Sequence, residues 1–299
     1  MKRGSAGAPG RHHGVGAAPR TTRPALVALI ALVALPALAQ DHLSVEASPI
    51  VWIAGGAFTM GASDADRVYA VSLCEDELEI EVPSTDPNGC GGGRFLIEED
   101  AHRETVPTFG IDRTEVTQDA YRRCVLDGAC APARTRESSV LAEGDHPVVG
   151  VRWTDARAYC RFVHGRLPTE AEWEKAARGD DDARRFPWGR NYESHLANHG
   201  RAPIGADAID GFLESAPVGS FPGGASPYGV LDMAGNVWEW TSDVPDLDAD
   251  VGLDLSASRI VRGGSFMHPA TALRVTARSW ATTDTSASDV GFRCAYDHL

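Results

Sequence analysis

The sequence predicts a single α+β domain that is rich in irregular loops. Three segments begin with a helix-capping residue and continue with apolar side chains at helical spacing, whereas the other apolar runs are short. Long stretches punctuated by proline separate them, with turns expected at Pro187, Pro203, Pro217, Pro222 and Pro227. The chain shows no internal repeat, and 299 residues are enough for one domain with a large core.

Residues 1–39 predict a secretory signal peptide. They carry five basic residues and no acidic one, and the apolar run 24–36 is followed by the cleavage pattern Ala37-Leu38-Ala39. The run is too short for a comfortable membrane span, and no cysteine stands at the cleavage point to carry a lipid anchor. We therefore expect an exported chain that begins at Gln40, is periplasmic or secreted, and has no membrane span.

The charge balance argues against nucleic acid or an anionic membrane as a partner. The formal net charge is −14, and without residues 1–39 the chain keeps 23 basic against 42 acidic residues. A surface of this sign repels phosphate groups. It is compatible with cation binding or simply with solubility.

The domain expected at residues 40–299 opens with a strand from Val51 that runs into a turn at Gly61. Residues 62–103 have the composition of an insertion, acidic at first and then rich in glycine. Helices are expected after Thr117, Thr154 and Thr169, and the last of these threonines starts a T-x-x-E capping box. Glycines end the second and third helices, at Gly165 and Gly179.

Residues 229–243, GVLDMAGNVWEWTSD, fit neither helical nor strand periodicity and predict a packed irregular loop. The turn inside it allows Asp232 and Glu239 to face one point. Backbone carbonyls near Gly235 and Val237 would then complete an oxygen cage for a hard cation such as calcium. Spacing alone favours the alternative, in which Glu239 caps or pairs locally and no metal binds.

The same stretch resembles a signature of the formylglycine-generating enzyme (sulfatase-modifying factor) family. Further motifs agree with this family in order, at residues 53–61, 115–118, 146–148, 165–174, 186–189, 262–266 and 291–294. The resemblance runs from about residue 50 to 296. It implies a C-type-lectin-like α+β fold, which is unusually poor in regular secondary structure.

The resemblance also implies structural calcium at one or both of two sites. In the family, residues matching Asn198 and Asp210 bind through side-chain oxygens, and those matching His199 and Phe212 bind through backbone carbonyls. The second family site matches the residues already singled out in the loop at 229–243, namely Asp232, Gly235, Val237 and Glu239.

Family oxidases carry two cysteines shortly after the G-G-S motif, and these bind copper(I) and oxidise a substrate cysteine with oxygen. Soft thiolates suit copper(I). Here His268 stands at the first cysteine position, and the segment for the second is about three residues shorter. Copper is therefore not expected and no residue is assigned a catalytic role, while Ser265, Arg274 and Arg278 are expected to line a remaining pocket.

These features predict a member of the family that binds rather than oxidises. Its partner would be an exported protein, a peptide or a glycan. The alternative is an oxidase that acts on cysteines of exported proteins through a substituted metal centre around His268.

The six cysteines of an exported chain suggest disulfides, for which fifteen pairings exist. The family resemblance implies that Cys160 pairs with Cys294. The C-x5-C spacing of Cys124 and Cys130 suits a local disulfide at a helix end. Cys74 and Cys90 then remain as the third pair.

Overall fold

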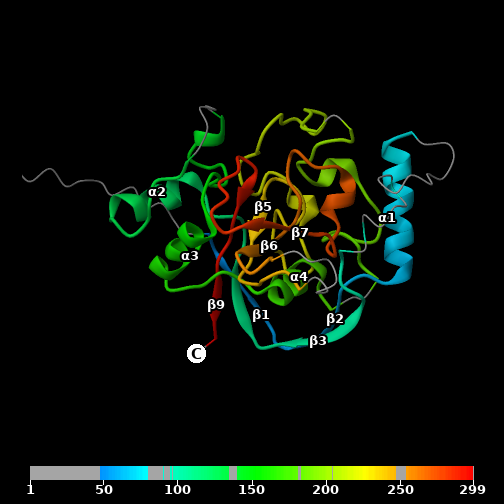
Figure 1. Cartoon of the computed structure of the whole chain (residues 1–299), viewed down its shortest axis with the longest axis horizontal. Helices are drawn as coiled ribbons and strands as arrows, with labels where there is room; N and C mark the ends of the chain where they lie inside the picture. Colours follow the sequence, from blue (N-terminus) through cyan, green and yellow to red (C-terminus); the bar gives the residue numbers. More distant parts are fainter. Residues whose placement is uncertain are drawn as a thin grey trace, which may run out of the picture. The chain divides into compact units, whose positions relative to one another are not determined.

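Three small sheets organise the fold (Figure 1). The computed structural model describes residues 48–79, 90, 95, 97–134, 140–180, 183–203, 205–246 and 254–298, and the expected signal peptide lies outside them. The first sheet has the antiparallel order β1-β4-β9, from Ile50–Ile53, Phe109–Asp112 and Ala295–Asp297. In the second, β2 (Gly56–Met60) pairs with β3 (His102–Val106).

The third sheet has the order β7-β6-β5-β8 and contains the tryptophan-rich stretch. Its strands are Arg278–Thr282, Ser258–Arg262, Trp238–Trp240 and Val290–Gly291, and its β5–β8 pair is parallel. It joins segments from the last third of the chain.

The expected strand from Val51 to Gly61 is interrupted. The chain breaks into β1 and β2 at Gly55, whose backbone lies against the backbone of Thr108, so that a Cβ at this position would be 2.6 Å from the Thr108 nitrogen. The turn at Gly61 is confirmed, since this residue has φ +87°.

The three predicted helices are confirmed as α2 (Gln118–Leu126), α3 (Trp153–Phe162) and α4 (Glu170–Arg178). Thr117 and Thr169 cap the first and third as expected. The second begins earlier than predicted, because Arg152 occupies the capping position and Asp155 bonds back to its backbone and side chain.

A fourth helix, α1 (Asp64–Glu77), lies in the predicted insertion and was missed. Ser63 and Asp66 form its capping box. Its buried face is formed by small and polar residues as well as Leu73, so the apolar periodicity that identifies a helix is weak. Figure 1 shows α1 on the side of the central strands opposite to α2 and α3.

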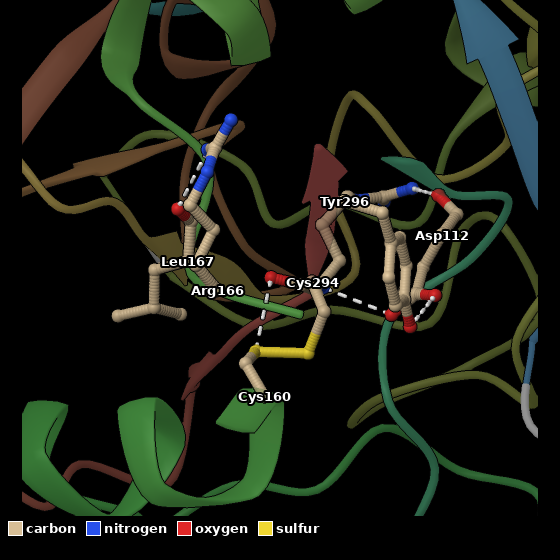
Figure 2. Close-up of a disulfide and its surroundings, with 7 residues drawn as sticks. Asp112, Cys160, Arg166, Leu167, Cys294 and Tyr296 are labelled. Carbon is tan, nitrogen blue, oxygen red and sulfur yellow. Dashed lines mark hydrogen bonds between the residues drawn. A yellow bond between two sulfur atoms is a disulfide. The ribbon is translucent and has the colours of Figure 1, made fainter. Parts of the chain in front are cut away.

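All three predicted disulfides are confirmed, and together they use every cysteine of the chain: Cys74–Cys90, Cys124–Cys130 and Cys160–Cys294. The last joins α3 to the segment before β9 inside the largest apolar cluster (Figure 2). Asp112 accepts hydrogen bonds there from the Cys294 nitrogen at 2.9 Å and the Tyr296 hydroxyl at 3.0 Å. Burial raises the pKa of Asp112 to about 6.

Three disulfides are typical of proteins that fold in an oxidising compartment. Within the described residues, no helix has both the length and the apolar character that a membrane crossing requires.

Candidate functional site

Residues 229–243 combine a strained turn with a short strand. Asp232, Gly235 and Asn236 have positive φ values of 57°, 80° and 62°. A loop was expected throughout residues 229–243. This is wrong for residues 238–240, which form β5 because Glu239 and Trp240 pair with β6. The turn brings Asn236 next to Asn198, and the backbone N–H of Asn236 donates to the backbone carbonyl of Asn198 at 2.7 Å.

Glu239 is fully buried in an ion pair with Arg293. The guanidinium donates to Oε1 at 2.6 Å and to Oε2 at 2.7 Å, and Trp173 Nε1 donates to Oε2 at 2.8 Å. Burial alone would lower the pKa of Arg293, but the Glu239 carboxylate raises it above the ordinary value. Both oxygens of Glu239 therefore already bind donors.

Asp232 lies beside a second buried acid, Glu115, which the sequence analysis did not select. Asp232 Oδ2 accepts the Gly219 amide at 2.7 Å, and Glu115 Oε1 accepts Asn236 Nδ2 at 3.0 Å. Within the described residues, Glu115 Oε2 has no N–H or O–H donor. Burial and the neighbouring Asp232 raise the pKa of Glu115 well above its ordinary value, because two adjacent buried carboxylates repel each other.

Hydrogen bonds connect three of the four residues expected at the first calcium site. Asp210 Oδ2 accepts the His199 amide at 2.7 Å, and its Oδ1 accepts the Phe212 amide at 3.0 Å. Asn198 is 1% exposed, and its Nδ2 donates to the Glu214 carbonyl. Its Oδ1 is buried without a hydrogen-bond donor among the residues described. A buried amide oxygen without a donor fits the oxygen-only preference of calcium.

The imidazole of His199 is used elsewhere. Its Nδ1 lies 2.6 Å from the Gly200 carbonyl, and its Nε2 lies 2.8 Å from the Tyr192 hydroxyl. The carbonyl has no proton, so Nδ1 is the donor in the first bond, and in a neutral imidazole Nε2 is then the acceptor in the second. His199 could therefore contribute to a cation only through its backbone carbonyl, as the resemblance implies.

His268 lies against Trp238, the residue at the start of β5. Ser265 Oγ is 2.7 Å from His268 Nδ1 and 2.9 Å from Asp289 Oδ2, and Trp238 Nε1 is 3.2 Å from the same imidazole nitrogen. Asp289 precedes β8, and no motif in the sequence marks it as a site residue. Ser265 is completely buried, so it positions His268 rather than facing solvent.

A cavity of about 190 Å³ opens beside His268, and both predicted arginines line it. Their guanidinium groups are already bound to carboxylates. Arg274 forms a buried ion pair with Glu98, and Arg278 binds Glu99 and Glu170 at 2.8 Å each. Because Glu98 and Glu99 come from the insertion, the arginines fasten the insertion to the cavity wall.

The sulfatase-modifying factor enzyme 1-like domain matches residues 37–298 of the chain. The chain belongs to this family. It is 33% identical to the formylglycine-generating enzyme of Mus musculus over 299 residues, which cover 88% of the chain and 79% of that enzyme. It is 43% identical over 162 residues to the inactive C-alpha-formylglycine-generating enzyme 2 of Bos taurus, covering 53% of the chain and 52% of that protein.

Among solved structures, PvdO from Pseudomonas aeruginosa has a TM-score of 0.60 and 26% identity, and the match covers 82% of this chain and 93% of that one. The predicted α+β fold of the formylglycine-generating-enzyme type is thus confirmed. The family includes proteins named as enzymes and proteins named as inactive, so the activity of this member depends on its own site.

Proposed function

We propose that the chain is an exported, non-oxidase member of the sulfatase-modifying factor family that acts as a binding or accessory module. The observation that carries this proposal is the bonding of the cysteine sulfur atoms. All six cysteines are engaged in disulfides. By the family resemblance, His268 matches a position at which the oxidases bind copper(I) through cysteine. Without a thiolate, the site lacks the soft ligands that copper(I) chemistry requires.

The module would be stabilised by calcium at one or both family sites. At the first, the orphaned Oδ1 of Asn198 and the carboxylate of Asp210 supply side-chain oxygens, with the carbonyls of His199 and Phe212. At the second, Asp232 is the stronger donor, because Glu239 is neutralised by Arg293. We add Glu115 to that site, since a divalent cation would relieve its repulsion with Asp232.

The cavity beside His268 is the proposed contact point for the partner. Its volume of about 190 Å³ accommodates one side chain or a comparable small group, and Trp238 and Phe95 give it aromatic walls. The partner class is an exported protein, a peptide or a glycan.

An oxidase assay tests the central claim. The chain is incubated with copper, oxygen and a sulfatase-type peptide that contains cysteine, and a formylglycine-generating enzyme serves as the positive control. We expect no aldehyde product. Aldehyde formed by this chain would contradict the proposal. For the binding role, Ala272→Trp is expected to fill the cavity and weaken binding in peptide and glycan arrays, whereas a substitution at exposed Leu126 should not.

A second candidate is an oxidase with a substituted metal centre. It is motivated by the Ser265 hydroxyl and the Asp289 carboxylate, which lie beside the His268 ring. Metal analysis decides between the two. Copper or iron retained after dialysis, and lost in His268→Ala, would support the enzyme, whereas calcium alone would support the module.

A further inference from the structure

A group of three potential metal ligands lies in the loop that connects α2 and α3, apart from the sites described above. One ligand atom from each of Glu143, Asp145 and His146 lies within 4.8 Å of the other two. The two carboxylates are exposed, whereas His146 is 3% exposed. The group therefore combines a fixed, buried imidazole with two acids that are free to turn.

The imidazole of His146 is oriented from outside this group. Its Nδ1 lies 2.9 Å from the hydroxyl of Ser215, a residue with no solvent exposure. Its Nε2 points at the carboxylates, and the nearest oxygen, Glu143 Oε2, is 3.6 Å away. This distance is longer than a hydrogen bond, and the described residues offer Nε2 no closer polar partner.

This arrangement matches the way proteins prepare a histidine for a metal. A ligating histidine usually donates its second ring N–H to an acceptor, which fixes the tautomer and leaves the other nitrogen with a lone pair. The Ser215 hydroxyl can accept such a bond when Nδ1 of His146 carries the proton. A local ion pair between His146 and Glu143 would explain the proximity of those two groups, but it would not explain the buried serine behind the ring.

The backbone of the loop is also fixed independently of any ion. The amides of Gln118 and Asp119, at the start of α2, donate at 2.9 Å to the carbonyls of His146 and Gly144. The amide of Val218 donates to the Asp145 carbonyl at 3.0 Å. Only the exposed carboxylate side chains would have to reorient when an ion binds, which keeps the entropic cost of forming the site small.

We propose that Glu143, Asp145 and His146 bind a divalent transition-metal ion of the Zn²⁺ type, with water completing the coordination. One imidazole nitrogen and two carboxylate oxygens suit zinc, which accepts nitrogen and oxygen ligands at about 2.0–2.2 Å. Calcium is disfavoured because it takes oxygen ligands. The two acids also supply a charge of −2, which compensates the ion.

The test uses the chain without a polyhistidine tag, with calcium present to saturate its proposed sites. Calorimetric titration with Zn²⁺ is expected to show one site per chain, and Co²⁺ is expected to give a visible absorption band. His146→Gln should weaken Zn²⁺ binding at least tenfold, and Ser215→Ala should weaken it about 10- to 100-fold. The matched control is His195→Gln, because His195 lies 3.9 Å from Glu193 but is exposed and has no such buried partner.

Each outcome decides the proposal. Equal Zn²⁺ affinity in the unchanged chain and in His146→Gln would mean an adventitious ion only. The same conclusion would follow if His195→Gln lost as much Zn²⁺ affinity as His146→Gln. Absence of binding in the unchanged chain would also overturn it. If His146→Gln does not fold, Asp145→Asn replaces it, since this side chain is exposed, and loss of the Co²⁺ band in that variant supports the site.

Discussion

Removal of the Cys160–Cys294 disulfide should be the most destabilising of the three possible disulfide removals. The two cysteines are 134 residues apart, whereas Cys74–Cys90 and Cys124–Cys130 span 16 and 6 residues. Loop-closure entropy of the unfolded chain gives about 5 kcal/mol for the first, about 3 for the second and about 2 for the third. A domain of this kind has a total stability of roughly 5–15 kcal/mol, so the first loss approaches the threshold of folding.

The perturbation is the double variant Cys160→Ala/Cys294→Ala, compared with Cys124→Ala/Cys130→Ala as the matched control. Both members of the first pair are fully buried, so a void left by the lost sulfur atoms adds to its cost. Guanidinium chloride unfolding, followed by tryptophan fluorescence, measures the two free energies of unfolding. The reasoning would be refuted if the first variant lost no more stability than the control, because the ranking rests on loop length.

Three further predictions concern charge and calcium. Chelation of calcium should lower the melting temperature, because an ion at a hundredfold excess over its Kd adds about 2.7 kcal/mol to the stability of the folded chain. This shift should be smaller in Asp210→Asn. A melting temperature that chelation leaves unchanged would contradict both calcium sites. Glu239→Gln should cost about 3–5 kcal/mol in chemical denaturation by leaving buried Arg293 without its counterion, and a neutral result would contradict the ion pair's role. Because the pKa of Asp112 is raised in the folded chain, this residue contributes its full stabilisation only below about pH 4, its pKa in the unfolded chain. The stabilisation is lost as the pH rises through about 6. Relative to Asp112→Asn, the unchanged chain should therefore lose about 2 kcal/mol between pH 4 and 7, and parallel pH profiles of the two proteins would refute the shift.

Local signals in the sequence predicted much of the regular structure. Thr117 and Thr169 could be recognised as caps because a capping bond reaches only three residues along the chain. The α1 helix was missed because its start lacks the usual glutamate or glutamine of a capping box and its buried face is not a continuous apolar stripe. Its stability comes from packing, which the local pattern does not express.

The candidate site was predictable in its residues but only partly in their roles. Asn198, His199, Asp210 and Phe212 were identified through the family motif, and the structure brings them into one loop. Arg274 and Arg278 do line a cavity as expected, but each is also bound to a glutamate of the insertion. Nothing near these arginines in the sequence indicates that pairing.

By itself, the sequence determined the fold class, the caps of α2 and α4, and the family, because these depend on residue types at short, fixed spacings. Only the tertiary structure decided which charges meet. Glu239 and Arg293 are 54 residues apart, Glu98 and Arg274 are 176 apart, and His146 and Ser215 are 69 apart. A buried ion or imidazole is stable only with a partner of matching charge or hydrogen-bonding capacity, and the packing of distant segments selects that partner.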